Sequence, residues 1–596
     1  MARRPSRAIL AALLAAGASV IGAQAATAGP ARDAHHRHGG RETRGHQERG
    51  RSRGHEMWGE NPASGRTATP IKHVVVIYGE NVSFDHYFGT YPNATNPSGE
   101  PSFHAAPGTP SVNGLTGALL TNNPNESNPQ LLNRSQAMTC DQDHGYTSEQ
   151  SAFDHGLMDQ FVQNTGHGLT LAQCLASEGN PAPATGTSPN YAVMDYYDGN
   201  TVTGLWNYAQ HFAMSDNSYG TTFGPSTPGA INVTSGQNYG AICGPTSAVY
   251  GGTPCTAAPG SAPATPGTTA PQGTETVYSD ADPNFDVCST TEDHNPASRT
   301  IQMGGQNVGD LLDRAGITWG WFQGGFASPG YVPGQPSTDD LNKVCTGTHQ
   351  NVGGGTVNDY SPHHEPFQYY ASTANPQHLP PTSVAMIGRQ DQANHQYDIR
   401  DFWAAADNGN LPAVSYLKAP AYQDGHAGYS DPIDEQQFVV DTINHLEKLR
   451  SWKSTAVIIN YDDSDGWYDH QMGPIITQSQ TPLDTLTAPG QCGTNPARVP
   501  TTDTGTPEQA LCGVGPRIPL MVISPYAKRN YVDNTFTDQT SIVKFIEDNW
   551  LGGERIGNGA ADASAGTLTN MFDWGGGGDR TLFLDPATGE SAPGQH

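Results

Sequence analysis

Short runs of apolar, mostly β-branched residues recur along the chain, and each stops at a polar residue. The two clearest runs cover residues 71–78 and 456–461. Runs of this length and composition are typical of strands that are buried on both faces. Weaker runs of the same kind predict further strands at 191–197, 317–322, 383–388, 412–417 and 518–524.

A longer segment, residues 432–450, has the spacing of an amphipathic helix, with its apolar residues on one stripe. Strands that alternate with helices predict an α/β fold with a large, mainly parallel central sheet flanked by helices. Two stretches rich in Gly, Pro and Thr, at 251–271 and 471–516, lack any periodicity and predict loop-rich insertions into this fold.

Acidic and amide side chains follow the two clearest strand predictions. The first run leads to Glu80 and Asn81, and the second leads directly to Asp462 and Asp463. In open α/β sheets, ligands bind just beyond the carboxyl ends of the strands. Adjacent carboxylates repel one another unless a cation lies between them, and carboxylate oxygens are ligands for hard divalent cations. Polar turn residues would explain either segment alone, but the two together predict a site for one divalent metal ion.

Residues 224–228, Gly-Pro-Ser-Thr-Pro, predict the beginning of a helix. Gly-Pro ends the preceding structure, Ser and Thr are common N-cap residues, and Pro is favoured in the first turn. The Ser226 hydroxyl would then lie beside unpaired N–H groups and the positive end of the helix dipole, where a phosphoryl group is stabilised. An ordinary helix cap is the alternative explanation.

Four histidines lie in loops rich in Gly, Pro and Asp rather than on apolar faces. They are His144, His363, His364 and His426. A histidine packed in the core is therefore less expected here than usual, and each of these histidines is a candidate functional residue.

The charge balance of the chain is strongly acidic. It has 29 Lys and Arg residues against 57 Asp and Glu residues, a net charge of −28. The first 54 residues contain 10 of the basic and 3 of the acidic residues, which leaves a net charge of −35 on the rest. Such an acidic body repels nucleic acids and anionic membrane surfaces, and it suits a secreted protein that binds divalent cations.

The N-terminal residues indicate export. Residues 1–28 combine a basic flank, a short apolar core and small-x-small endings, the pattern of a cleavable secretory signal. That core is too short to span a membrane and no later stretch qualifies, so we expect no integral membrane segment and a secreted or periplasmic location. Arg3 and Arg4 leave the choice between general and twin-arginine export open.

Residues 29–66 are rich in His, Arg and Gly and have almost no apolar content, which predicts a disordered arm. We expect residues 67–590 to form one domain, because Glu80 and Asp462 lie about 380 residues apart and must converge. Eight cysteines in an exported chain predict disulfide bonds. Their spacing leaves the connectivity open; the close pairs Cys243 with Cys255 and Cys492 with Cys512 are the expected pairings.

Three motifs together resemble those of the bacterial phosphoesterase family that contains phospholipases C and secreted acid phosphatases. They are Glu-Asn-x-Ser-Phe-Asp-His-Tyr-Phe-Gly at 80–89, Gly-Pro-Ser at 224–226, and Tyr-Asp-Asp followed by Gly-x-Tyr-Asp-His at 461–470. The resemblance extends from about residue 71 to 550 and implies an alkaline-phosphatase-like fold, with residues 67–590 as a phosphoesterase catalytic domain. It also implies hydrolysis of a phosphate ester by a metal-assisted Ser or Thr nucleophile.

Matching these motifs residue by residue assigns expected roles around one divalent metal ion of open identity. The expected metal ligands are Glu80, Asp462, Asp463 and Ser226; the substrate-binding residues are Asn81, His144 and His363; the catalytic residues are Ser226, His144, His364 and His426. Ser226 is expected to be the nucleophile, and His364 or His426 to protonate the departing oxygen. His363 competes with His364 for its place, and Thr227 competes with Ser226.

The expected activity is that of a secreted, metal-dependent phosphomonoesterase of the acid-phosphatase type, with a phosphoserine intermediate. This choice rests on chain length, since phosphocholine-specific members of the family usually carry extra C-terminal domains. A phospholipase C that cleaves phosphodiester lipids is the first alternative, and a non-catalytic secreted binding protein with the same fold is an alternative of another class. The expected partner is a small phosphate ester or a phospholipid headgroup, not a nucleic acid, and the oligomeric state stays open.

Overall fold

The computed structural model of this chain describes residues 66–166, 192–242, 267–273, 279–289, 300–335, 340–474 and 514–592, with the short pieces 173, 248–250, 253–254, 275–277, 486–488 and 491–492. Contacts within the chain divide it into residues 1–59 and 60–596, and every described residue belongs to the second unit. The signal at 1–28, the arm at 29–66 and the domain boundaries therefore stay predictions. Most of the two expected insertions, at 251–271 and 471–516, also falls outside the described residues.

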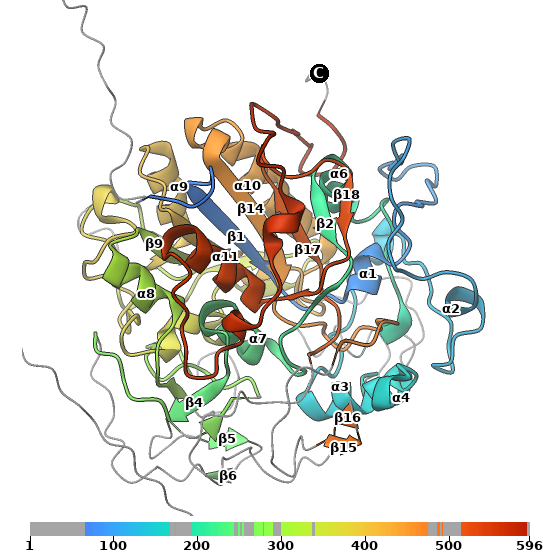
Figure 1. Cartoon of the computed structure of the whole chain (residues 1–596), viewed down its shortest axis with the longest axis horizontal. Coiled ribbons are helices and arrows are strands. Elements are labelled where there is room, and N and C mark those ends of the chain that lie inside the picture. Colours follow the sequence, from blue (N-terminus) through green and yellow to red (C-terminus); the bar gives the residue numbers. More distant parts are fainter. Residues whose placement is uncertain are drawn as a thin grey trace, which may run out of the picture. The chain divides into compact units, whose positions relative to one another are not determined.

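The centre of the described unit is an eight-stranded sheet with the strand order β12-β9-β13-β1-β14-β17-β2-β18 (Figure 1). Its strands are β1 (His73–Gly79), β2 (Ala213–Ser215), β9 (Trp319–Gln323), β12 (Gln396–Asp398), β13 (Val414–Lys418), β14 (Thr455–Tyr461), β17 (Leu520–Ile523) and β18 (Tyr531–Asp533). Strand β17 runs antiparallel to its neighbours β14 and β2, and the other adjacent pairs of this sheet are parallel. The prediction of an α/β fold with a mainly parallel sheet is confirmed.

Helices surround this sheet in Figure 1, which explains why its central strands are apolar throughout. The longer helices are α3 (Tyr146–Phe153), α6 (Thr203–His211), α7 (Ser226–Ser235), α8 (Val308–Ala315), α9 (Ile399–Asp407), α10 (Pro432–Leu446) and α11 (Thr540–Trp550). Short helices are α1 (Phe84–Phe88), α2 (Ala118–Thr121) and α4 (Phe161–Asn164). Side chains of β1 and β14 from Val74 to Ile77 and from Ala456 to Ile459 are at most 2% exposed.

Small two- and three-stranded sheets lie in the loops outside the central sheet. They comprise β3 (Ser218–Tyr219) with β19 (Thr537–Asp538), β4 (Tyr239–Ile242) with β7 (Glu275–Thr276) and β8 (Gln302–Met303), β10 (Thr348–Gln350) with β11 (Thr356–Asn358), β5 (Ala248–Tyr250) with β6 (Thr253–Pro254), and β15 (Leu486–Ala488) with β16 (Gln491–Cys492). Within the described residues, no helix is long and apolar enough to cross a membrane.

Two of the strand predictions are wrong. Residues 191–197 and 383–388 contain 3₁₀ turns, at Ala192–Met194 and Val384–Met386. Val193 and Met194 are buried in a separate apolar cluster outside the central sheet, so their hydrophobicity reflects burial and not strand pairing. The other predicted strands correspond to β1, β9, β13, β14 and β17, and the helix predicted at 432–450 corresponds to α10.

The expected cysteine pairings cannot be compared, because Cys243, Cys255 and Cys512 lie outside the described residues, as does the side chain of Cys492. A different disulfide bond is present between Cys288 and Cys345. The general prediction of disulfide bonds is therefore confirmed, and this pairing is an addition to it.

The register of the sheet determines which residues meet at its carboxyl edge. Gly79 of β1 pairs with Tyr461 of β14, and Ile77 of β1 pairs with Leu417 of β13. The residues that follow these pairs therefore emerge side by side. As a result, Glu80, Asp462 and Lys418 share one edge of the sheet although they come from three distant parts of the chain.

A buried ionic cluster connects the segment after β1 to the segment after β14. Arg517, which is fully buried, donates hydrogen bonds from Nε to Asp469 Oδ1 (2.9 Å) and from Nη2 to Asp85 Oδ1 (3.1 Å). His470 Nδ1 lies 2.6 Å from Asp85 Oδ2. A buried ion pair that loses one partner leaves an uncompensated charge, so this cluster constrains where both segments run.

Replacing Arg517 with Met should lower the free energy of unfolding by about 3–5 kcal/mol, because Asp85 and Asp469 would stay buried with less positive charge beside them. Urea unfolding followed by circular dichroism measures this change. Arg314→Met is the matched control: Arg314 forms a 2.9 Å ion pair with Glu554, and both side chains are about half exposed, so the loss should be about 1 kcal/mol or less. Equal losses in the two variants would contradict the structural role given to Arg517.

Candidate active site

Three carboxylates gather at the carboxyl edge of the sheet, where β1 and β14 end. Glu80 directly follows β1, while Asp462 and Asp463 directly follow β14, and their exposed fractions are 1%, 2% and 4%. Asp462 Oδ1 accepts hydrogen bonds from the backbone N–H groups of Asn81 (2.9 Å) and Asp463 (2.8 Å). Asn81 has a positive φ of 55°, a turn conformation that Asn tolerates better than most residues. The backbone after β1 is thus held against the carboxylate after β14.

The Ser226 hydroxyl lies among these acidic side chains. Ser226 begins helix α7, and its Oγ lies 3.2 Å from Glu80 Oε2, 3.1 Å from Asp463 Oδ2 and 3.3 Å from Asn81 Oδ1. The neighbouring Thr227 hydroxyl instead contacts Tyr369 Oη at 3.2 Å. Of the two hydroxyls that competed in the sequence, only that of Ser226 therefore faces the carboxylates.

Gly229 allows α7 to approach this closely. A Cβ atom at this position would lie 2.1 Å from the backbone oxygen of Asp462. Any larger residue would push the helix away from β14, and the Ser226 hydroxyl would move with it. The Thr227 N–H donates to Asp280 Oδ1 (2.9 Å), so one of the N–H groups of the helix start, which were expected to be unpaired, has a partner.

The electrostatics of the carboxylates favour a bound cation. Burial and repulsion from Asp462 raise the pKa of Glu80 and of Asp463 well above the usual range. Burial also disfavours the charged form of Asp462, but a hydrogen bond from Glu80 and the charge of Lys418 hold its pKa below the ordinary value. Three buried carboxylates cannot all ionise at one place without a cation among them. Because their oxygens and the serine hydroxyl are hard ligands, these residues fit a divalent metal ion.

Lys418 and His364 lie on the other side of Glu80. The Lys418 ammonium contacts Glu80 Oε1 and lies 3.8 Å from Asp424 Oδ2. His364 Nδ1 lies 3.2 Å from Glu80 Oε1. Burial and the nearby cationic groups lower the pKa of His364 well below its ordinary value, so its imidazole is neutral at neutral pH. His363 Nδ1 lies 3.2 Å from Ser361 Oγ, and its ring packs against the His364 ring.

His144 lies on the Asn81 side of the site. Its Nε2 is 3.4 Å from Asn81 Nδ2, and its Nδ1 is 2.7 Å from the backbone oxygen of Gln142 and 3.2 Å from Asp465 Oδ1. Burial opposes the charged imidazolium, but the carboxylates of Asp463, Asp141 and Asp465 outweigh it and raise the pKa of His144 well above 6.5. His144 is therefore a protonated, positively charged group at neutral pH.

His426 completes the group of histidines. Its ring lies 6.1 Å from the ring of His144 and stacks on Tyr429 at 4.2 Å. Burial lowers the pKa of His426. With Asp141, His144 and Asp465 it forms a set of ligand-type groups whose atoms lie within 4.8 Å of one another, as Glu80, His364 and Asp424 also do.

Four charged residues of the site were not among the predicted ones: Lys418, Asp424, Asp141 and Asp465. Each has a signal in the sequence that is visible in retrospect. Lys418 directly follows the strand predicted at 412–417, and the three acids lie within three residues of a predicted site residue. None could be distinguished from a surface charge without knowing which loops face the sheet edge.

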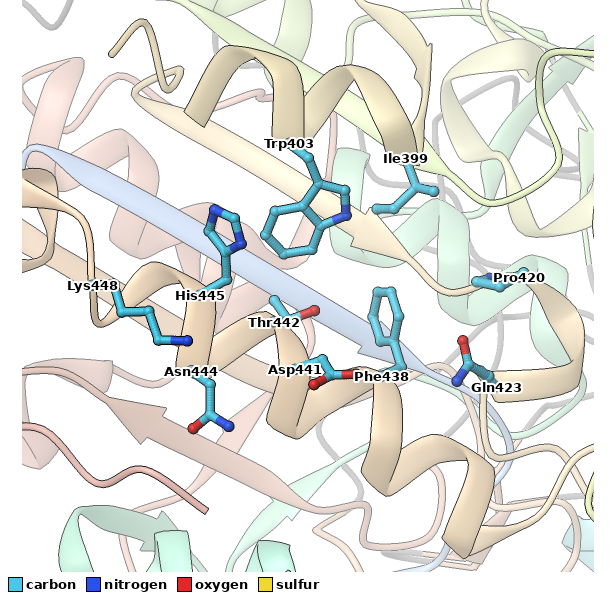
Figure 2. A pocket seen from close by; sticks show the side chains of 10 residues that line it. All are labelled: Ile399, Trp403, Pro420, Gln423, Phe438, Asp441, Thr442, Asn444, His445 and Lys448. Carbon is cyan, nitrogen blue, oxygen red and sulfur yellow. The ribbon is translucent and has the colours of Figure 1, made fainter. Parts of the chain in front are cut away.

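A hollow between α9 and α10 lies outside this site. Figure 2 shows the aromatic rings of Trp403 and Phe438 on its opposite sides, with Asp441 and Lys448 toward α10. None of the carboxylates and histidines described above lines this hollow. Its lining residues are Ile399, Trp403, Pro420, Gln423, Phe438, Asp441, Thr442, Asn444, His445 and Lys448.

Comparison with known proteins connects this site to a family. The model of the phosphoesterase family matches residues 71–551. The chain belongs to the phosphoesterase family. This confirms the resemblance inferred from the three motifs, and it places the chain in a family of enzymes that act on phosphoric esters.

Several curated relatives are named phospholipase C. The chain is 25% identical over 505 residues to a non-hemolytic phospholipase C of Burkholderia pseudomallei, covering 82% of this chain and 56% of that protein. It is 31% identical over 180 residues to a hemolytic phospholipase C of Pseudomonas aeruginosa, covering 29% and 22%, and 28% identical over 179 residues to phospholipase C B of Mycobacterium tuberculosis, covering 29% and 32%. The chain thus spans about half the length of the Burkholderia relative, and less of the others.

Replacing Asp463 with Asn should abolish metal binding, because an amide removes one of the three negative charges that face Ser226. Elemental analysis of purified protein should find less than about a tenth of the wild-type metal content. Asp441→Asn, on the exposed side of α10, is the control and should keep the full content. Unchanged metal in Asp463→Asn would show that Asp463 is not a ligand.

Proposed function

We propose that this chain is a metal-dependent hydrolase of phosphodiesters of the phospholipase C type, exported through its N-terminal residues. The contact of the Ser226 hydroxyl with Glu80 and Asp463 at the edge of the sheet is the observation that carries this proposal. The names of the relatives favour the phospholipase C alternative over the acid-phosphatase activity that chain length had suggested. A phosphomonoesterase stays the second candidate, since the same nucleophile and cation would serve either ester.

Ser226 is the nucleophile in this proposal. Its oxygen attacks phosphorus, the ester oxygen of the leaving group departs, and a phosphoserine forms. When bound, a divalent ion would lower the pKa of the serine hydroxyl and polarise a phosphoryl oxygen. The ligands for it would be Glu80 Oε2, Asp462, Asp463 and Ser226 Oγ. Water then attacks the phosphorus of this intermediate, which releases a phosphate monoester from a diester substrate and restores the serine hydroxyl.

Asn81 is suited to hold a phosphoryl oxygen, and the positive charge of His144 lies beside it. Asn81 Nδ2 and His144 Nε2 lie 3.4 Å apart, beside the Ser226 hydroxyl that contacts Asn81 Oδ1. A neutral amide and a positively charged imidazole at fixed positions stabilise the negative charge that builds up on these oxygens.

The pKa directions also separate the roles of the histidines. His144 is protonated and can donate a proton to the departing oxygen. The imidazoles of His364 and His426 are neutral, so we assign the proton donor to His144 rather than to the His364 or His426 expected from the motifs. His426 is then the candidate that accepts a proton from water in the second step, and His364 positions Glu80.

Hydrolysis of a panel of substrates, with and without chelator, tests the proposed activity. We expect a higher kcat/KM on p-nitrophenyl phosphorylcholine than on p-nitrophenyl phosphate, loss of activity with chelator, and a loss of about 10³-fold or more in Ser226→Ala. Thr227→Ala is the matched control and should stay active, because its hydroxyl contacts Tyr369 and not the carboxylates.

Three other outcomes would decide against parts of this proposal. A preference for the monoester would favour the acid-phosphatase candidate. A Ser226→Ala variant with more than about a tenth of the wild-type rate would exclude Ser226 as the nucleophile. No hydrolysis of any ester by folded, metal-loaded protein would favour the non-catalytic binding protein.

The pH dependence of kcat/KM tests the assignment of His144. Because the proton donor must be charged, activity should fall as the pH rises through the raised pKa of His144. Removing a neighbouring negative charge in Asp141→Asn should lower that pKa and move the alkaline limb to lower pH by about one unit. Asp143→Asn, which changes an exposed residue of the same loop, should leave the limb in place. An alkaline limb that does not move in Asp141→Asn would exclude His144 as the donor.

A further inference from the structure

The two oxygens of the Glu80 carboxylate have different surroundings. Oε2 accepts a hydrogen bond from Ser226 at 3.2 Å and faces the proposed metal position. Oε1 lies against the Lys418 ammonium and 3.2 Å from His364 Nδ1. One carboxylate therefore belongs to two adjacent groups of charged residues, one on each side.

The group on the Oε1 side has the composition of a metal site. Glu80, His364 and Asp424 each offer one ligand atom, these atoms lie within 4.8 Å of one another, and all three side chains are buried. Two carboxylates and one imidazole are a common ligand set for transition metals such as Mn²⁺ and Zn²⁺. A protein would bind a metal ion readily with such a set if the space between the ligands were open.

Lys418 fills this space. Its side chain is 1% exposed, and its ammonium contacts Glu80 Oε1 and lies 3.8 Å from Asp424 Oδ2. The strand position explains why the lysine reaches it, since Lys418 is the last residue of β13, next to the end of β1. The ammonium thus occupies the same side of Glu80 and Asp424 as a metal ion bound by this group.

We propose that the Lys418 ammonium takes the place of a second metal ion, so that this chain holds one exchangeable cation at Glu80 Oε2 and one permanent cation at Glu80 Oε1. The proposal rests on the proposed function for the first of these positions. Geometry supports it, because the ammonium contacts Glu80 Oε1 and lies 3.8 Å from Asp424 Oδ2, the two carboxylates that a second metal ion would need as ligands.

Two variants of residue 418 test the charge of the lysine side chain separately from its volume. Lys418→Ala removes the charge and opens the space between Glu80, His364 and Asp424. Lys418→Met removes the charge but keeps an unbranched side chain of similar length in that space. Mn²⁺ is the probe, because it accepts both carboxylate and imidazole ligands.

Elemental analysis after dialysis against Mn²⁺ counts the ions per chain. We expect about one equivalent for the wild type and for Lys418→Met, and about two for Lys418→Ala. The double variant Lys418→Ala/His364→Ala should return to about one, because it removes a ligand of the new position. The electron paramagnetic resonance spectrum of the Lys418→Ala protein should show two coupled Mn²⁺ ions, since Glu80 would contribute to both.

A folded Lys418→Ala protein that binds no more Mn²⁺ than the wild type would overturn the proposal. If this variant folds only in the presence of metal, the dependence of its Tm on Mn²⁺ concentration gives the number of ions taken up on folding, which should be two and not one. These readouts do not depend on hydrolysis. A wild type that binds no Mn²⁺ but a Lys418→Ala variant that gains one ion would contradict the metal ligands of the proposed function while leaving the role of Lys418 intact.

Discussion

The site depends on how this protein keeps four carboxylates buried within a few ångströms at the end of a sheet. Glu80, Asp424, Asp462 and Asp463 are each 4% exposed or less. Burial and mutual repulsion would protonate such a cluster unless positive charge is supplied. The described chain supplies it from Lys418 on one side and protonated His144 on the other, and the proposed divalent ion would add to it beside Ser226. The positions of these cations determine the surroundings of each carboxylate oxygen: Glu80 Oε1 contacts Lys418, and Glu80 Oε2 contacts the Ser226 hydroxyl.

The register of the sheet determines which charged side chains meet at this edge. Parallel pairing of β1 with β13 and β14 brings the ends of three strands to one edge, and a shift of one residue would turn Glu80 or Lys418 toward the opposite face. The approach of α7 then depends on Gly229, and the loops that follow β1 and β14 are tied together by Arg517. The strand pairing that stabilises the sheet therefore also positions Glu80, Asp462 and Asp463 beside Ser226.

Much of this could be predicted from the sequence because it is encoded locally. Apolar runs identified β1 and β14, and the residues after them identified Glu80, Asn81, Asp462 and Asp463, which the structure brings together with Ser226. The predictions that failed concern features that depend on contacts between distant parts of the chain. Val193 and Met194 are apolar because they pack in a separate cluster, and the N–H of Thr227 donates to Asp280, which no local pattern predicts. The three-residue strands β2, β12 and β18 are too short to show a period.

Lys418 is the clearest example of information that a single sequence does not contain. A lysine after four buried strand residues can as easily reach solvent as point inward, and only the neighbouring Glu80 and Asp424 decide that it stays buried. Its charge cannot dissociate into solution as a metal ion does, and an ammonium has no open coordination position for a phosphoryl oxygen. In the proposed arrangement, one fixed and one exchangeable cation would therefore divide two tasks. Lys418 opposes the effect of burial on the pKa of Glu80 and orients its carboxylate, while a single bound ion would serve the chemistry proposed at Ser226.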